Sequence, residues 1–323
     1  MRYLITGGAG FVGSNLARTL QEQQPDAELL IVDDFRLGTF ANLSIEGPHG
    51  WSYRGQVVAG PLHELDLTGL IDDFGPDVIY HEASITDTTV TDEAQMIRDN
   101  VEPFTELVEA AVQQRIPLVW ASSAATYGTA ANGALQEKRP FRLDDAGRPA
   151  NVYGFSKWVM ENVQRRTLAA HPEAHLVGLR YFNVFGPGEQ NKGKMASMIY
   201  QLAGQMLDGK RPRIFAPGDQ ARDQIYVKDV VGCTLAGGRP DARPGVYNCG
   251  TGHATSFNQI VAALNDALGT SLEPDYFENP FAFYQDYTCA DLSQTTAGLG
   301  WQPAYTTHDA IVEYARILRD QHR

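Results

Sequence analysis

The stretch that decides the fold is Tyr3-Leu-Ile-Thr-Gly-Gly-Ala-Gly-Phe-Val-Gly13, an apolar run that meets a glycine-rich turn and continues into Ser14-Asn-Leu-Ala-Arg-Thr-Leu20. The pattern predicts a strand, a tight turn and a helix. The G-x-x-G-x-x-G spacing lets the chain turn, lets a diphosphate approach the backbone, and packs the helix against the strand. The free N–H groups of the helix start would face that anion. We therefore expect a dinucleotide at Gly7, Gly10, Phe11, Val12 and Gly13; a glycine turn without a ligand is the alternative.

A second apolar run, Leu29-Leu-Ile-Val32, ends in Asp33 at the distance expected for a ribose-binding carboxylate, about twenty residues past the turn. Such a carboxylate can accept hydrogen bonds from both hydroxyls of an adenosine ribose. After a third short strand, Asp66 and Leu67 are expected at the adenine ring. Asp66 could equally cap the helix that follows it.

Strand-like runs alternate with helix-like segments along the chain, and the predicted elements are strands over 56–60, 77–83 and 116–121 and a helix over 92–114. This alternation predicts an α/β fold: a Rossmann-type doubly wound parallel sheet with a smaller α/β substrate domain. Asn100 lies in the predicted helix, and we expect it to point toward the cofactor. The expected domains are an NAD(P)-binding domain over 1–182, to which 225–255 returns, and a mainly substrate-binding domain over 183–323.

Composition narrows the possible partners. The chain has 323 residues and a formal net charge of −13, which argues against nucleic acid and anionic membranes as ligands. The segment 189–228 departs from this average, with seven basic and four acidic side chains and a net charge of +3. That segment predicts a localised anionic ligand, with a solvated charged face as the alternative.

Cysteine usage and hydropathy indicate the cellular compartment expected for the protein. Its three cysteines are widely spaced, with no C-x-x-C pair, so neither a disulfide framework nor a zinc site is expected. No apolar run is long enough to span a bilayer, and no leader precedes the first strand. We expect a cytoplasmic protein without a membrane segment or a metal.

The residues expected to carry the chemistry follow the fifth strand. Ser123 lies just past that strand, and Asn151-Val-Tyr-Gly-Phe-Ser-Lys157 opens a helix that places Tyr153 and Lys157 on one face. An ammonium one turn away, together with a positive nicotinamide ring, favours the phenolate and lowers the pKa of Tyr153 toward working pH. Lys157 can also hold the nicotinamide ribose, and Ser123 can hydrogen-bond the substrate oxygen. A Tyr-x-x-x-Lys pair alone would be a structural helix face; the glycine turn and Asp33 favour catalysis.

The dipeptide His81-Glu82 ends the fourth predicted strand. A metal site is one interpretation, but the other histidines are scattered and none stands at ligand spacing. We favour a strand-end pair near the cofactor.

Together these motifs resemble the extended short-chain dehydrogenase/reductase family of nucleotide-sugar epimerases and dehydratases, over nearly the whole chain. The matching features are the glycine turn, the Ser123 segment, Tyr153-x-x-x-Lys157 and Arg180-Tyr-Phe-Asn-Val-Phe-Gly-Pro187. The resemblance implies that Val184 contacts nicotinamide through its backbone and that Asn183 touches substrate. It also implies a nucleotide-diphosphate sugar as substrate and self-association through the helices around 92–114 and 151–168.

Three stretches look more specifically like ADP-glycero-manno-heptose 6-epimerases: Ala121-Ser-Ser-Ala-Ala-Thr-Tyr-Gly128, Asn191-Lys-Gly-Lys-Met-Ala-Ser197 and Phe283-Tyr-Gln-Asp-Tyr-Thr-Cys-Ala-Asp-Leu292. This subfamily implies that Lys192 is a second acid/base group opposite Tyr153; a phosphate-binding or solvated loop lysine is the alternative. Arg222 and Tyr284 would grip the diphosphate, and Lys194, Gln201 and Phe215 would line the sugar.

Several positions depart from that subfamily. Phe40 stands where a lysine reads the 2′-phosphate of NADP, and Asp33 and Asp34 would repel that phosphate, although Arg36 could offset them. NAD is therefore favoured over NADP, as a tightly bound cofactor. Lys194, Gln201 and Phe215 replace residues expected near the sugar.

These departures leave alternatives open. A UDP-hexose 4-epimerase uses the same Ser, Tyr and Lys, so it is the second candidate. A 4,6-dehydratase is disfavoured because such enzymes carry Asp-Glu where this chain has Ala124-Ala125. A non-catalytic NAD(P)-binding protein on the same fold is the remaining interpretation.

Overall fold

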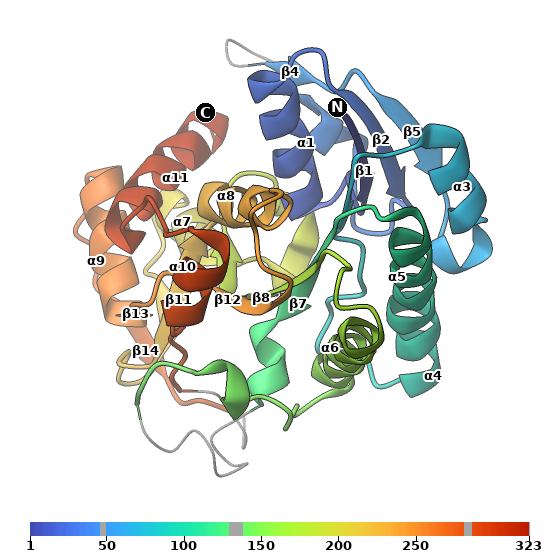
Figure 1. The fold of residues 1–323 in the computed structure, drawn as a ribbon. Helices are drawn as coiled ribbons and strands as arrows, with labels where there is room; N and C mark the ends of the chain where they lie inside the picture. Colours follow the sequence, from blue (N-terminus) through green and yellow to red (C-terminus); the bar gives the residue numbers. More distant parts are fainter. Residues whose placement is uncertain (46–49, 129–137, 281–285, 323) are drawn as a thin grey trace.

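The computed structural model describes residues 1–45, 50–128, 138–280 and 286–322. At its centre, within this described part, lies a seven-stranded parallel sheet (Figure 1). Its spatial order is β5 (Gln56–Ala59), β2 (Glu28–Asp33), β1 (Arg2–Thr6), β6 (Val78–His81), β7 (Leu118–Ser123), β8 (Leu176–Tyr181) and β12 (Gly245–Cys249). The predicted Rossmann-type fold is confirmed.

The inner strands read as continuous apolar runs because both faces of the sheet are covered. One face packs on α3 (Leu67–Phe74), α5 (Glu102–Gln114) and α6 (Val152–Ala170), and the other on α1 (Phe11–Gln23) and α8 (Val227–Gly237). A short helix, α10 (Ser293–Leu299), lies against β12 and α8. Because all seven strands run parallel, their carboxyl ends lie at one edge of the sheet, where ligands of such folds bind.

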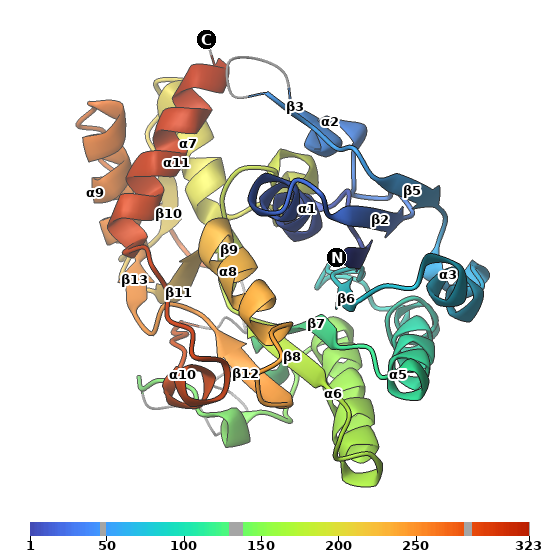
Figure 2. The same cartoon turned by 45° about the horizontal axis from the view of Figure 1, so that its top comes forward.

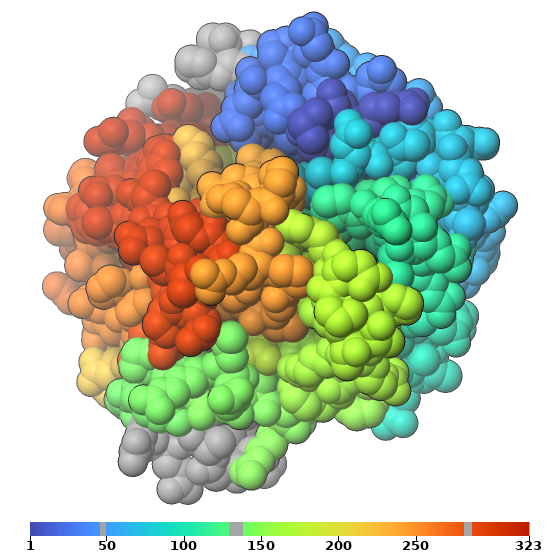
Figure 3. All heavy atoms as spheres, viewed as in Figure 1, coloured from blue at the N-terminus to red at the C-terminus, as the bar shows by residue number. Residues whose placement is uncertain are grey.

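After β8 the chain enters a second layer of structure (Figure 2). A three-stranded sheet contains β9 (Asn183–Phe185), β11 (Ala221–Tyr226) and β13 (Ala254–Ser256). It packs with three helices, α7 (Met198–Leu207), α9 (Phe257–Leu268) and α11 (Thr307–His322), around a third apolar cluster. Strand β10 (Arg213–Phe215) pairs with β14 (Asp275–Phe277) at its rim. The space-filling view shows the blue-to-cyan N-terminal part and the orange-to-red C-terminal part on opposite sides of the visible face (Figure 3).

The segment 227–249 crosses back to the large sheet, since α8 packs on α1 and β12 pairs with β8. The boundary between domains at residue 182 stays a prediction. Among the described helices, none is long and apolar enough to cross a membrane.

The predicted helix over 92–114 is interrupted. It consists of α4 (Glu93–Met96), a π-helical turn η2 (Ile97–Val101) and α5. Pro103 lacks an N–H to donate to the preceding turn, which removes a regular helical hydrogen bond just where the π turn ends. Sequence reasoning also missed a small hairpin of β3 (Ser44–Ile45) and β4 (Trp51–Ser52), which follows α2 (Phe40–Leu43).

Candidate active site

The glycine turn has the shape of an anion cradle. Gly7 has a φ of 69°, and a Cβ there would lie 2.5 Å from the Ala83 nitrogen, so only glycine fits. A Cβ on Gly13 would overlap the Gly7 carbonyl. Gly10 caps α1 without a side-chain hydrogen bond, and no acidic residue lies in the first turn. The N–H groups of Gly7, Ala9 and Gly10 donate within the fold, whereas those of the first turn of α1 have no intrahelical acceptor and can meet a phosphate, as a bound dinucleotide requires.

Asp33 joins this turn to the end of β2. Its Oδ2 accepts a hydrogen bond from the Ala9 nitrogen at 2.9 Å, and its Oδ1 accepts one from the Phe35 nitrogen at 2.8 Å. Burial raises the pKa of the carboxyl group, and these two backbone hydrogen bonds lower it. The carboxylate thus sits beside the glycine turn, where the ribose is predicted.

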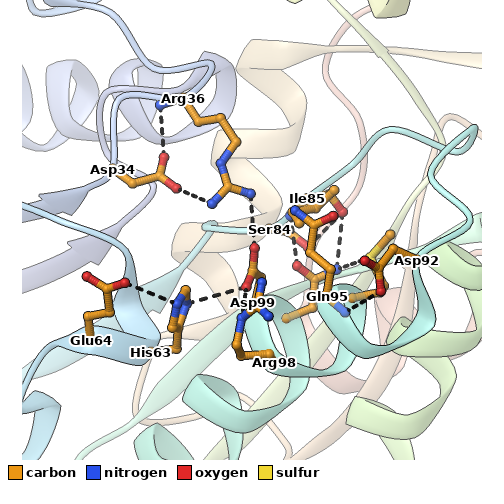
Figure 4. A network of polar contacts seen from close by, with 12 residues as sticks. Asp34, Arg36, His63, Glu64, Ser84, Ile85, Asp92, Gln95, Arg98 and Asp99 are labelled. Atoms are coloured by element: carbon orange, nitrogen blue, oxygen red, sulfur yellow. Dashed lines mark hydrogen bonds and ion pairs between the residues drawn. The ribbon is translucent and has the colours of Figure 1, made fainter.

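A cluster of charges surrounds the loop after Asp33 (Figure 4). The Arg36 guanidinium lies between Asp34, at 3.0 Å, and Asp99, at 3.1 Å. Asp99, whose side chain is only 7% exposed, also contacts Arg98 at 3.0 Å and His63 at 3.4 Å. Arg36, which the sequence offered as a partner for a 2′-phosphate, is therefore already engaged by two carboxylates.

Asp66 caps α3, because its Oδ1 accepts a hydrogen bond from the Gly69 nitrogen at 2.9 Å. The capping alternative is thus observed, and the helix starts at Leu67, which is buried. Asn100 is also committed within the protein. Its side chain exchanges two hydrogen bonds with the Ile85 backbone and donates to Ser156 Oγ at 3.1 Å. It ties the loop after β6 to α6.

The fold brings the three predicted catalytic residues together. Ser123 ends β7, and its hydroxyl lies close enough to Tyr153, in the first turn of α6, to lower the pKa of the phenol. Lys157 Nζ lies 6.0 Å from the Tyr153 ring centroid and donates to the Ala121 carbonyl at 2.7 Å. Tyr153 and Lys157 are both buried, so the pair is shielded from bulk water.

The start of α6 is fixed by local chemistry. Asn151 caps the helix, since its Oδ1 accepts from the Gly154 nitrogen at 2.7 Å. A Cβ on Gly154 would lie 2.7 Å from the Ala125 carbonyl, so this glycine lets the helix approach the exit of β7. That close approach sets the contact between Ser123 and Tyr153.

The electrostatics of this trio differ from expectation. Burial raises the pKa of Tyr153, and the hydrogen bond from Ser123 lowers it only in part. Burial also lowers the pKa of Lys157 to about 7, against the opposing effect of the negative charge on Glu82. The expected lowering of the tyrosine pKa is thus not a property of the chain alone, because desolvation outweighs the opposing effect of Ser123.

Glu161 fastens α6 to the sheet. Its carboxylate accepts hydrogen bonds from Ser122 Oγ at 2.7 Å and, at two atoms, from Arg180 at 2.8 Å. Arg165 donates a further one at 2.6 Å. Glu161 lies one turn beyond Lys157, so the anchor supports the helix that carries the catalytic pair. Sequence spacing gave no signal for it.

A segment from the second layer lies against the cofactor turn. Asn15 donates to the Pro187 carbonyl at 2.8 Å, and the Asn42 amide donates to the Ala9 carbonyl at 3.0 Å and to the Gly188 carbonyl at 3.4 Å. Within the segment, the Glu189 carboxylate accepts from the Gly186 and Ser197 nitrogens. The chain over 186–197 is thus held at the start of α1.

Lys192 is carried by this segment, on the 3₁₀ turn η6 (Gln190–Met195). Its Nζ lies 5.3 Å from the centroid of the Phe11 ring, at the N-terminus of α1. Burial lowers its pKa, and the Glu189 carboxylate raises it. The structure thus places this lysine at the N-terminus of α1, where the dinucleotide is predicted.

The chain matches one protein family over most of its length. Residues 3–250 match the model of the NAD-dependent epimerase/dehydratase family. The chain belongs to this family. The resemblance to extended short-chain dehydrogenases/reductases that act on nucleotide sugars is confirmed.

Solved structures of family members align along almost the entire chain. An ADP-L-glycero-D-manno-heptose-6-epimerase from Helicobacter pylori is 34% identical, with a TM-score of 0.86, over 98% of this chain and 96% of that one. A UDP-glucuronic acid 4-epimerase from Bacillus cereus, in complex with UDP-glucuronic acid and NAD, is 25% identical, with a TM-score of 0.80, over 98% and 100%. A UDP-glucose 4-epimerase from Thermotoga maritima, solved with UDP-glucose, shares the fold with 23% identity and a TM-score of 0.87, over 100% of both chains.

Two residues predicted to contact ligands in this epimerase/dehydratase-family chain also bond within the protein. Asn183 donates to the Asp223 carbonyl at 3.1 Å and to Thr288 Oγ1 at 3.2 Å, and Val184 pairs with Ile225. Both residues therefore hold β9 against β11. Their contacts with substrate and nicotinamide stay predictions.

Other predicted substrate residues lie along β10, β11 and η6. Arg222 is buried on β11, and the Phe215 ring packs edge-on against Phe277 with centroids 4.8 Å apart. Gln201 donates to the Ala196 carbonyl at 2.8 Å, whereas Lys194 is exposed. Tyr284 lies outside the described residues. The part of the chain that the structure describes contains no cluster of three metal-ligating side chains.

Proposed function

We propose that the protein is an NAD-dependent nucleotide-sugar epimerase that inverts the side-chain carbon of ADP-glycero-manno-heptose. The observation that carries the proposal is the pair Ser123 and Tyr153, with Lys157 beside it, at the sheet edge next to the glycine turn. The choice of sugar rests on the 34% identity to the Helicobacter pylori heptose epimerase over nearly the whole chain.

The side chains can divide the proton chemistry between them. When bound, a nicotinamide takes a hydride from the substrate carbon and returns it to the opposite face. Tyr153 Oη accepts the proton of the substrate hydroxyl, and Ser123 Oγ donates a hydrogen bond to the same oxygen. Lys157 stabilises the phenolate. After the sugar has turned, Lys192 Nζ donates a proton to the same oxygen in its second position. The alternative role of Lys192 is to bind the diphosphate.

The cofactor choice follows from the adenosine end of the site. Asp33 and Asp34 would repel a 2′-phosphate, and Arg36 is engaged by Asp34 and Asp99. Phe40, which is 76% exposed, supplies no charge there. We therefore propose NAD, tightly held, as the cofactor, with NADP as the alternative.

A UDP-hexose 4-epimerase is the second candidate. It is favoured by the sugar-side departures, because Gln201 is turned to the Ala196 carbonyl and Lys194 is exposed. Family members that bind UDP sugars also align over the full length. A 4,6-dehydratase is disfavoured by Ala124 and Ala125, which cannot act as acid and base. A non-catalytic NAD(P)-binding protein would not need the buried Tyr153–Lys157 pair.

Product analysis by NMR tests the proposal. The purified protein is incubated with ADP-D-glycero-D-manno-heptose or UDP-glucose, with NAD or NADP added. We expect inversion of the heptose alone, loss of turnover in Tyr153→Phe, and a substantial loss in Ser123→Ala and Lys192→Ala. Tyr276→Phe, a change on the exposed ring of β14, is the matched control and should keep full activity. Inversion of UDP-glucose alone would select the second candidate, and full activity of Tyr153→Phe would refute the acid/base assignment.

Assembly and location are also proposed. We propose a homo-oligomer that packs through the helices around 92–114 and 151–168, which the mass measured by light scattering would test. Cys233, Cys249 and Cys289 are free thiols, which supports a reducing, cytoplasmic location that cell fractionation would test.

A further inference from the structure

Glu82 lies at the junction of the cofactor turn and the catalytic strand. It directly follows β6, and its nitrogen donates to the Thr6 carbonyl at 3.0 Å. A Cβ on Gly7 would lie 2.8 Å from the Glu82 carbonyl carbon, so the two backbones are in close contact. Glu82 is thus fixed to the same turn that is predicted to hold the dinucleotide.

The strand register carries Glu82 toward Lys157. His81 pairs with Trp120 across β6 and β7, so Glu82 comes level with Ala121. The Ala121 carbonyl is the acceptor of the Lys157 ammonium, at 2.7 Å. The Glu82 backbone and the acceptor of the Lys157 ammonium therefore lie level with each other on neighbouring strands.

The Glu82 carboxylate is held in place from the other side. Tyr181 Oη donates to its Oε1 at 2.8 Å. The same hydroxyl lies 2.7 Å from Thr234 Oγ1 on α8. Tyr181 pairs with Ser123 in the sheet, so this support is itself attached to the catalytic strand.

Titratable side chains face the Glu82 carboxylate and Lys157 from three elements. From α6 come Lys157 and Tyr153, from β8 comes Tyr181, and from β6 comes His81. His81 is neutral, since burial and the charge of Lys157 lower its pKa to about 3, and its Nδ1 is bonded to Thr6. The other polar partner of Lys157, the Ala121 carbonyl, carries no charge. Glu82 is the anionic side chain that acts on Lys157.

We propose that Glu82 is a positioning residue for catalysis: its carboxylate, oriented by Tyr181, keeps the buried Lys157 side chain cationic beside Tyr153. A neutral Lys157 could not stabilise the Tyr153 phenolate, so the carboxylate extends catalytic competence to higher pH. Each charge favours the other, since burial raises the pKa of Glu82 to about 7 while the hydrogen bond from Tyr181 and the charge of Lys157 oppose that rise. The inference rests on the proposed function for its catalytic meaning, but the charge relation itself needs neither substrate nor cofactor.

The decisive measurement is therefore the titration of Lys157 in the full-length protein. Lysine labelled with ¹³C at Cε gives an NMR signal for each side chain, and Lys157→Met assigns the relevant one by its loss. In Glu82→Gln, which keeps the size of the side chain, we expect the Lys157 midpoint to fall by about one pH unit or more. Glu82→Asp keeps the charge and should recover part of that shift.

Tyr181→Phe is the control for a merely structural role. It removes the hydrogen bond to Glu82 but leaves the carboxylate, so the Lys157 midpoint should move less than in Glu82→Gln. A midpoint in folded Glu82→Gln that coincides with the wild-type midpoint overturns the proposal. If Glu82→Gln does not fold, Glu82→Met, which also lacks the charge, decides: a midpoint lowered from wild type supports the proposal, and an unchanged midpoint overturns it.

Turnover gives a second, separable readout. With ADP-D-glycero-D-manno-heptose, the alkaline limb of the pH–rate profile should move to lower pH in Glu82→Gln by the shift seen in the NMR titration. An unmoved limb would overturn the catalytic role. If the wild type inverts no nucleotide sugar, the proposed function fails, whereas the NMR titration still decides the relation between Glu82 and Lys157.

Discussion

Replacing Glu161 by glutamine is expected to destabilise the protein because it breaks a buried ion pair. Glu161 is fully buried and its partner Arg180 has a side chain that is only 2% exposed. Glutamine keeps the shape of the side chain and one acceptor oxygen, so the change removes the charge without creating a cavity. An uncompensated guanidinium is then left beside α6.

The size of the effect follows from these contacts. Breaking a buried pair by neutralising one partner costs about 3–5 kcal/mol. Arg180 keeps hydrogen bonds to Tyr127 Oη and to the Leu143 carbonyl, both at 2.9 Å, which places the cost near the lower end. With an unfolding entropy of about 2.1 cal/mol/K per residue, a chain of 323 residues loses about 4 °C in Tm for 3 kcal/mol.

Thermal unfolding followed by circular dichroism measures this change. The matched control is Glu22→Gln, which removes another Glu–Arg helix pair, Arg18–Glu22, at 2.7 Å and with a Glu22 side chain that is 55% exposed. An exposed pair of this kind contributes about 0.3–0.5 kcal/mol, so Tm should fall by less than about 1 °C. Equal Tm changes in the two variants would refute the view that Glu161 anchors α6 through a buried charge.

Three further changes test other parts of the site. Gly13→Ala should abolish NAD binding in calorimetry, because a methyl group would overlap the Gly7 carbonyl; wild-type affinity would contradict the cradle. Asp99→Asn frees one side of Arg36 and should raise the NADP-to-NAD affinity ratio, an effect that should vanish when Arg36→Ala is added. His81 has a pKa of about 3 in the fold against 6.5 in the unfolded chain, so the unfolded state binds the extra proton between these values. The free energy of unfolding should therefore fall as pH drops below 6.5, by up to about 1.4 kcal/mol per pH unit, and His81→Gln should flatten that dependence in urea titrations.

The sequence predicted those features that local chemistry determines. The glycine turn and the shared face of Tyr153 and Lys157 depend on neighbours within a few residues, so spacing alone was sufficient. For Asp66, spacing left helix capping and a contact with adenine as alternatives, and the structure shows the cap. The parallel sheet with helices on both faces followed from the alternation of strands and helices, whereas the order of its strands was not predicted. The position of Ser123 beside Tyr153 followed from the family pattern and from the rule that ligands bind at the carboxyl edge.

Other features depend on contacts that spacing cannot show. Glu161 meets Arg180 and Asp99 meets Arg36 only after the sheet has formed, and each looks like an ordinary helix charge in the sequence. The π turn arises where Asn100 bonds across to Ile85, a partner fifteen positions away. The raised pKa of Tyr153 reflects burial, which the expected effect of a nearby cation did not include.

The contact between Asn15 and the Pro187 carbonyl joins chain positions 172 residues apart, directly over the start of α1. A dinucleotide bound at this turn would be bordered on one side by the second layer, the part of the molecule that we propose to bind the sugar. Release of the dinucleotide would require these two parts to separate. A hydride that passes to the cofactor and back to the substrate requires no exchange of the cofactor. Such an arrangement suits an enzyme that reuses one cofactor molecule over many turnovers instead of trading it with the surrounding solution.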